Sequence, residues 1–391
     1  MTQRLWVDVT RTCRNALHTG IQRVVRQLLA ALQQRGTAMG VAVLPVVFEA
    51  ERWYALDFLP PHVKQWGAPT TTAAAMPRSV PLQPGAGDVI VLADAAWYLD
   101  PWPAVDSALA RGATLVGVVH DVLAVMQPQW FRPGLGERFA RYVHALAERA
   151  ERVVVPTSVV AHNLEAVLGQ GRVTISVLAW AGDFWAPART PPRQAWPLDT
   201  QAPFVLTVGT VEPRKGHALV LEAMEALWAQ GSHLRWVVAG APGWCTEALA
   251  QRLRAHPQAP SRLMWLDSVS DAALLGLYDH AQALVFASAD EGFGLPLAEA
   301  AARGCPVLAA DVPVAREVGG NWAAFLPRND VTALIDALAG LAPRAQPAMR
   351  PRGTATRRWL DVADDVLSLT DRIDKRVDPS NRADVDNPCT V

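Results

Sequence analysis

The stretch Ser288 to Glu299, SADEGFGLPLAE, holds two glutamates, Glu291 and Glu299, with seven residues between them. It follows a short apolar run that predicts a strand, and Pro296 is typical of the first turn of a helix. Glycines let the backbone approach a ligand closely, and a helix N-terminus offers free amides to an anion. Carboxylates accept hydrogen bonds from sugar hydroxyls. The stretch therefore predicts a site for a phosphorylated sugar, although a plain turn with Glu299 complementing the helix dipole is the alternative.

Two adjacent cations, Arg214 and Lys215, lie in a second such turn, VGTVEPRKGH from Val208 to His217. They could neutralise a diphosphate, most strongly when a sugar leaves and charge builds on it. A solvated basic turn is the alternative for this segment taken alone. The whole chain has 36 basic and 37 acidic residues and a net charge of −1, so nothing global points to nucleic acid or to an anionic polymer. Any anion site must therefore be local.

Further polar residues follow predicted strands in the first half of the chain. His120 and Asp121 end one strand, where the histidine would face a ligand and the aspartate could orient the histidine ring. The alternative is a structural histidine that only caps the strand. Gly20 and Arg23 open a predicted helix, and Arg23 could bind an anionic acceptor. Asp94 follows another strand and is the expected acceptor-side acid, with loop capping as the alternative.

The elements that must position these residues alternate between strands and helices, which predicts an α/β fold with parallel sheets. The expected strands of the first half cover 5–9, 41–48, 88–93, 114–120, 153–156 and 174–178, and helices are expected at 20–35 and 138–152. Those of the second half cover 204–208, 235–239, 263–266, 283–287, 306–309 and 323–326. Residues 65–87, rich in Thr, Ala, Pro and Gly, predict a long surface excursion within the first domain.

This pattern predicts two doubly wound, Rossmann-like domains that face a cleft. The first domain is expected to span 1–182 and the second 204–355, with a proline-rich linker between them at 183–203. A helix at 356–373 is expected to cross back to the first domain, and a flexible tail to follow at 374–391. Parallel sheets bind ligands beyond the carboxyl ends of their strands, so both binding edges would meet at the cleft.

The composition of the chain also indicates its location in the cell and whether it needs a cofactor. The chain has 391 residues and is 51% hydrophobic, yet its apolar stretches are far shorter than the ~20 residues of a spanning helix, and its start lacks a secretory pattern, so we expect a cytoplasmic protein. The four cysteines are scattered and predict reduced thiols rather than a disulfide framework. Because no D-x-D pair ends a strand and no zinc-ligand spacing occurs, we expect no metal and no cofactor.

Together, E-P-R-K at 212–215 and the two spaced glutamates resemble the motifs of glycosyltransferase family 4, a large retaining family with the two-lobed GT-B fold that includes bacterial polysaccharide mannosyltransferases. The resemblance implies that Glu291 holds the hydroxyls of the donor sugar and that Glu299 binds the nucleotide ribose. It places Arg214 and Lys215 on the donor pyrophosphate and His120 near the donor sugar. Many members have an arginine where this chain has Thr210. The remaining residues that the resemblance assigns to the donor are Gly20, Gly209, Thr210, Gly292, Phe293, Gly294 and Leu295.

The predicted function is therefore retaining, metal-independent hexosyl transfer, with GDP-mannose as the leading donor and a glycan or lipid-linked acceptor of bacterial surface polysaccharide synthesis. The alternatives are another sugar-nucleotide enzyme of this fold, such as an epimerase or a phosphorylase, and a non-catalytic scaffold of a polysaccharide assembly complex. Aromatic and arginine side chains in 130–152 could dock peripherally on an anionic bilayer at the inner face of the cytoplasmic membrane, and core packing is the alternative.

Overall fold

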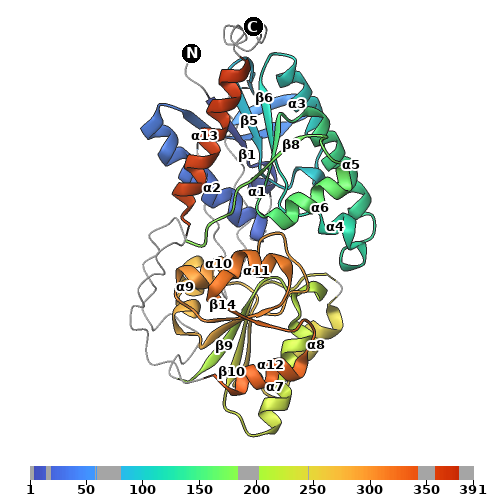
Figure 1. The fold of residues 1–391 in the computed structure, drawn as a ribbon, viewed down its shortest axis with the longest axis vertical. Coiled ribbons are helices and arrows are strands. Elements are labelled where there is room, and N and C mark those ends of the chain that lie inside the picture. The colour runs from blue at the N-terminus through green and yellow to red at the C-terminus, as the bar shows by residue number, and fades with distance from the viewer. Residues whose placement is uncertain are drawn as a thin grey trace, which may run out of the picture.

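The strands of the computed structural model form two sheets, one in each of two stacked lobes (Figure 1). The structure describes residues 4–14, 19–57, 59, 81–183, 202–244, 246–341 and 357–377, without the side chains of 371–377. We call the eight-stranded sheet and the helices that cover it the N lobe, and the six-stranded sheet and its helices the C lobe. Both are α/β with central parallel strands, which confirms the predicted pair of Rossmann-like domains.

The sheet of the N lobe has the order β4-β3-β2-β1-β5-β6-β7-β8. Its strands are β1 (Arg4–Asp8), β2 (Ala42–Glu49), β3 (Arg52–Ala55), β4 (Pro81–Leu82), β5 (Asp88–Leu92), β6 (Thr114–Val118), β7 (Arg152–Val155) and β8 (Thr174–Val177). Its helices are α1 (Thr10–Arg14), α2 (Gly20–Met39), α3 (Trp102–Leu109), α4 (Leu123–Met126), α5 (Leu135–Arg149) and α6 (Ser158–Leu168). Alternate residues of β1 point to opposite faces, so Leu5 and Val7 enter one core and Trp6 the other.

The sheet of the C lobe has the order β11-β10-β9-β12-β13-β14 and is parallel throughout. Its strands are β9 (Phe204–Val208), β10 (Arg235–Ala239), β11 (Leu263–Leu266), β12 (Ala283–Phe286), β13 (Val307–Ala310) and β14 (Ala323–Leu326). Its helices are α7 (His217–Ala229), α8 (Glu247–Arg254), α9 (Asp271–His280), α10 (Leu295–Ala302), α11 (Pro313–Gly319) and α12 (Val331–Ala339). Strands β12 and β9 lie side by side at the point where the strand order reverses, which is where such sheets bind ligands.

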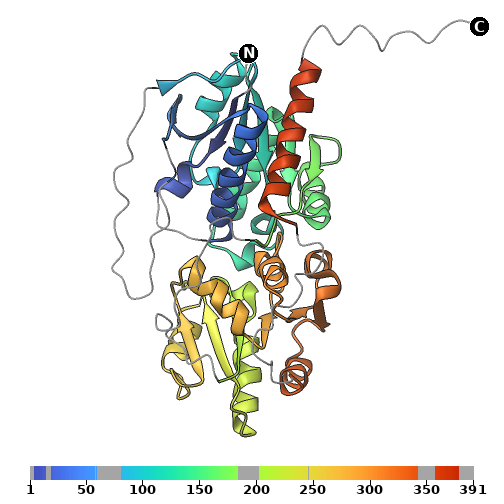
Figure 2. The same cartoon turned by 90° about the vertical axis from the view of Figure 1, so that its left-hand side faces the viewer.

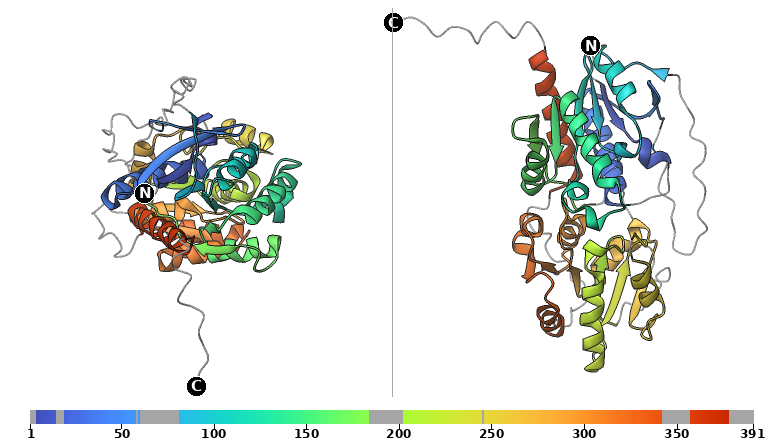
Figure 3. Two further views of the ribbon diagram at one scale, coloured as in Figure 1. Left: turned by 90° about the horizontal axis from the view of Figure 1, so that it is seen from above. Right: turned by 90° about the vertical axis from the view of Figure 1, so that its right-hand side faces the viewer.

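The last helix, α13 (Trp359–Val377), returns to the N lobe and lies along α2 (Figure 2). Trp359, Val362 and Val366 belong to the same buried cluster as Leu28 and Leu32 of α2. Figure 3 shows this helix on the N lobe from two further directions. The helix expected at 356–373 is therefore present, but it continues to Val377, so the predicted flexible tail does not begin at 374.

Every predicted strand is present, with ends shifted by at most two residues. The sequence missed β3 and β4, which pair antiparallel beside β2, because they are short and have no alternating pattern. Residues 184–201 of the predicted linker and residues 65–80 of the predicted excursion lie outside the described residues, so the domain boundaries stay a prediction. Pro81–Leu82, within the expected excursion, form β4.

The membrane hypothesis rested on α5 and the residues before it. Phe139, Tyr142 and Leu146 are buried in the core of the N lobe, and this burial favours the core-packing alternative. None of the helices in the part of the chain that the structure describes is long and apolar enough to cross a bilayer.

Candidate functional site

Two loops at the carboxyl edge of the C-lobe sheet bring the predicted donor residues together. The loop after β9 contains Arg214 and Lys215 in a short 3-10 turn, and the loop after β12 contains Glu291. The amide of Ala289 donates to the carbonyl of Arg214 at 2.7 Å and joins the loops. Gly216 has a φ of +72°, and a Cβ atom there would lie 2.3 Å from the carbonyl oxygen of Ala287. Glycine is therefore required where the two loops meet.

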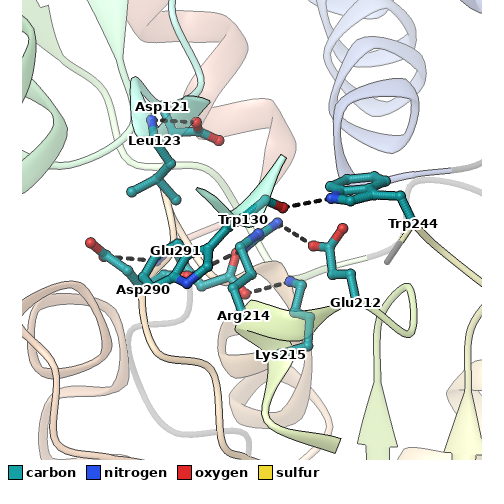
Figure 4. A network of polar contacts seen from close by, with 9 residues as sticks. All are labelled: Asp121, Leu123, Trp130, Glu212, Arg214, Lys215, Trp244, Asp290 and Glu291. Atoms are coloured by element: carbon teal, nitrogen blue, oxygen red, sulfur yellow. Dashed lines mark hydrogen bonds and ion pairs between the residues drawn. The ribbon is translucent and has the colours of Figure 1, made fainter. Parts of the chain in front are cut away.

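The Glu291 carboxylate lies between the two cations (Figure 4). Arg214 Nη1 donates to Glu291 Oε2 at 2.6 Å and to the carbonyl of Asp290 at 3.1 Å, while Lys215 Nζ pairs with Glu291 Oε1. Arg214 Nη2 also lies 2.8 Å from Glu212 Oε1. Residues from two loops, 76 positions apart, thus form one ion cluster, as the sequence interpretation required.

Because the ion cluster is buried, its charges interact strongly with one another. Burial alone would raise the pKa of Glu291, but Arg214 and Lys215 outweigh it and hold that pKa at about 2. Burial raises the pKa of Glu212 despite the same two cations. Glu291 therefore stays ionised at any physiological pH, and two cations face its charge in a site that is almost closed to water.

The N lobe contacts this cluster through the strand end at His120. A Cβ atom at Gly292 would lie 2.0 Å from the carbonyl oxygen of His120 and 2.9 Å from Cβ of Asp121, so only glycine allows this approach. The hydroxyl of Thr157 donates to the carbonyl of Gly292 at 2.9 Å. His120 thus lies directly above the loop that holds Glu291.

The His120 ring is held by the backbone. Its Nε2 lies 2.8 Å from the carbonyl oxygen of Ala93, which can only accept, so this nitrogen has the proton of a neutral imidazole. Burial lowers the pKa of His120 and favours the same neutral form. The Asp121 carboxylate accepts from the amide of Leu123 at 3.0 Å, so the contact seen to orient the ring comes from Ala93.

Several predicted donor residues lie where the lobes touch. Phe293, from the C-lobe loop, is buried in the cluster that includes Val118 and Trp180 of the N lobe, and Leu295 packs against the same cluster. A Cβ atom at Gly20, the first residue of α2, would lie 3.7 Å from Leu295. Gly294 precedes α10 as its N-cap. Phe293 and Leu295 therefore join the lobes, a role that the sequence did not assign to them.

The remaining donor-side predictions lie after β9. Gly209 lies beside the Lys215 side chain, since a Cβ atom there would be 3.5 Å from its Cε. Thr210 lies against Gly243 of the loop after β10. Neither residue belongs to the ion cluster, and their contact with a donor stays a prediction.

The acceptor-side prediction Asp94 is fully buried. Its oxygens accept hydrogen bonds from the amide of Thr12 at 2.5 Å and from that of Ala95 at 2.8 Å. These contacts fit the loop-capping alternative.

Asp8, at the end of the neighbouring strand, is also fully buried and accepts from the amide of Thr10 at 2.9 Å. Within the described residues Asp8 Oδ2 has no hydrogen-bond partner. Burial, followed by the charge of Asp94, raises the pKa of Asp8 to about 7.

We expect Asp8→Asn to remove a pH dependence of stability. The unfolded chain releases this proton near pH 4 and the folded protein releases it only near pH 7. The free energy of unfolding therefore falls as the pH rises between these values, by on the order of 4 kcal/mol. The variant should thus melt at a higher temperature than the unmodified protein at pH 8, with no such gain at pH 4. Asp267→Asn, at an exposed carboxylate of the C lobe, is the control. Equal changes of melting temperature with pH in the unmodified protein and D8N would contradict the assignment.

Two further contacts between the lobes escaped the sequence interpretation. Glu317 of α11 accepts from the amide of Ser158 at 2.8 Å and from its hydroxyl at 2.7 Å, and so caps the N-terminus of α6 in the N lobe. Trp244 Nε1 donates to the carbonyl of Trp130 at 2.6 Å (Figure 4), and its ring stacks on Phe131. No local pattern marks such residues, because their partners are far away in sequence. Asp8 could have been found by the strand-end rule that found His120.

Comparison with known proteins shows that the chain is similar to glycosyltransferases. Residues 189–348 match the family described as glycosyl transferases group 1. The serotype-specific mannosyltransferase WbdA of Escherichia coli is 35% identical over 341 residues, which cover 82% of this chain and 39% of that protein. The O-antigen chain mannosyltransferase B of Escherichia coli is 32% identical over 42% of this chain and 43% of its own length. The chain thus resembles bacterial polysaccharide mannosyltransferases, but it spans about two fifths of these relatives.

Solved structures agree on the fold. Sucrose-phosphate synthase from Thermosynechococcus elongatus superposes with a TM-score of 0.66 at 18% identity, covering 96% of this chain and 100% of that one. The pneumococcal O-GlcNAc transferase GtfA, solved with UDP and GlcNAc, gives 0.59 at 12% identity, covering 96% and 98%. The fold is that of the GT-B glycosyltransferases, as predicted.

Proposed function

We propose that this chain, whose residues 189–348 belong to the glycosyl transferases group 1 family, is a retaining, metal-independent mannosyltransferase that uses GDP-mannose. Its acceptor is a glycan or a lipid-linked saccharide of bacterial surface polysaccharide synthesis. The observation that supports this most is the ion cluster of Arg214, Lys215 and Glu291 directly below His120. Similarity to mannosyltransferases over 82% of the chain supports the choice of sugar.

In this proposal the cations bind the donor diphosphate. Arg214 and Lys215 neutralise the charge that builds on the leaving nucleoside diphosphate, and they act in a buried site where each charge interacts strongly. Glu291 accepts hydrogen bonds from the hydroxyls of the mannose ring and keeps both cations in place. The neutral His120 borders the same space from the N lobe.

The configuration at the anomeric carbon is retained if the acceptor hydroxyl attacks from the same face of the sugar from which the nucleoside diphosphate leaves. The leaving phosphate then takes the proton of the acceptor hydroxyl, and no protein base is needed. The N lobe supplies the acceptor side, where α2 begins at Gly20 and β6 ends near His120.

The test is a transfer assay with a panel of nucleotide sugars, among them GDP-mannose and UDP-glucose, and with mannosyl acceptors of increasing length. We expect GDP release that requires the acceptor, a product with the α-configuration of the donor by NMR, and rates unchanged by EDTA. Nucleotide release without an acceptor would indicate a different enzyme of this fold. Failure of the chain to bind any sugar nucleotide in calorimetry would favour a scaffold.

A further inference from the structure

The Glu299 carboxylate is held by one side chain from each lobe. Arg23 Nη2 of the N lobe lies 2.6 Å from Oε1, and the Tyr278 hydroxyl of α9 donates to Oε2 at 2.8 Å. Glu299 and Tyr278 are 3% and 0% exposed, so both contacts lie in a region shielded from water. Burial keeps the pKa of Tyr278 well above its ordinary value, and the hydroxyl therefore remains a donor.

Two directed contacts fix the orientation of this carboxylate. Each carboxylate oxygen has two lone-pair sites, so Glu299 can keep both partners and still accept hydrogen bonds from a diol. A carboxylate already oriented loses less entropy when the diol binds than a mobile one. Arg23 and Tyr278 hence prepare Glu299 to accept hydrogen bonds, and Arg23 also compensates the charge that burial disfavours.

Arg23 reaches Glu299 only because the lobes are together. It lies in the first turn of α2, whose first residue, Gly20, faces Leu295 at the start of α10. Phe293 and the Thr157 to Gly292 hydrogen bond join the lobes nearby. If the lobes separated, Tyr278 would stay with Glu299, because both lie in the C lobe, and Arg23 of the N lobe would leave it.

We infer that Arg23 and Tyr278 are positioning residues that orient Glu299 for the ribose hydroxyls of the donor, and that Arg23 links donor affinity to closure of the lobes. This rests on the proposed function, in which Glu299 binds the ribose. It differs from the sequence expectation that Arg23 binds an anionic acceptor. Because linkage is reciprocal, a donor that binds better to the closed form must itself favour closure.

A double-mutant cycle with GDP as the probe tests the first part of this inference. Calorimetry should show GDP binding about fivefold weaker in Tyr278→Phe and about tenfold weaker in Arg23→Gln. In the Glu299→Gln background, Arg23→Gln should cause no further loss, because a residue that acts through Glu299 has nothing left to position. If Arg23→Gln weakens GDP binding equally in both backgrounds, Arg23 contacts the nucleotide directly and the inference is wrong.

Small-angle scattering of the same variants tests the link to closure. Without nucleotide, Arg23→Gln should have a larger radius of gyration than the unmodified protein, whereas Tyr278→Phe, which removes a partner from within one lobe, should not. Equal radii in all three proteins would overturn the link. Melting curves establish that each variant is folded, and Arg23→Lys, which keeps the cation, should recover part of the affinity. Absence of GDP and UDP binding to the unmodified protein would instead refute the proposed function.

Discussion

Replacing Lys215 by Ala is expected to lower the turnover of mannosyl transfer by about 100- to 1000-fold, the usual effect of removing one group that stabilises developing negative charge. Lys215 Nζ contacts Glu291 in a site where both side chains are largely buried, so water cannot replace it well. Arg214 lies 2.6 Å from Glu291 in the unmodified protein, so we expect the carboxylate to keep this partner in the variant. The rate of GDP release from saturating GDP-mannose, with acceptor present, measures the effect.

A matched control is Arg252→Ala, which removes a cation of the C lobe that is half exposed and paired with Glu225. Such an exposed pair contributes little to stability, and turnover should stay within about twofold of the unmodified rate. The melting temperature of Lys215→Ala should stay close to that of the control. A Lys215→Ala protein that is folded and transfers mannose at the full rate would refute the role of Lys215.

Glu291→Gln should change binding and turnover in opposite directions. Loss of one negative charge beside two cations leaves more positive potential for a diphosphate, so GDP should bind about tenfold more tightly. Glutamine cannot hold Arg214 and Lys215 as Glu291 does, and it presents one acceptor oxygen to the sugar in place of two. Misplacement of the sugar by about 1 Å is enough to lower turnover by about 100-fold.

Glu291→Asp provides the comparison for this variant. It keeps the charge but draws the carboxylate back, so turnover should fall while GDP affinity stays close to that of the unmodified protein. Calorimetry with GDP and initial rates with GDP-mannose separate the two effects. If GDP bound no better to Glu291→Gln than to Glu291→Asp, the charge of Glu291 would not repel the diphosphate. The diphosphate would then have to bind away from Arg214 and Lys215.

The α/β class could be predicted because central strands such as β12 are short, apolar and buried on both faces. The residues of the ion cluster could be predicted as well, since Arg214, Lys215 and Glu291 follow strands and resemble family motifs. The contacts that join the lobes could not. Phe293 looks like part of a loop, and Glu317 like one more charge on a helix, until the partner lobe is in place.

Asp94 shows that a residue selected from the sequence can also have another environment in the fold. Its place at a strand end predicted a side chain that faces a ligand, but its carboxylate is fully buried and accepts hydrogen bonds from backbone amides of its own lobe. A strand end places a side chain near the edge of the sheet, and the packing of the following loop decides whether it faces solvent.

By itself, the sequence determined the elements and which residue types stand at their ends, since hydrophobic periodicity and glycine turns are local properties of the chain. Tertiary structure alone decided that Glu291 lies between Arg214 and Lys215, that Arg23 reaches Glu299, and that Gly292 touches His120. The physical reason is that charges and close contacts act over a few ångströms in space. Packing of the two lobes brings into that range residues that the chain separates by dozens to hundreds of positions.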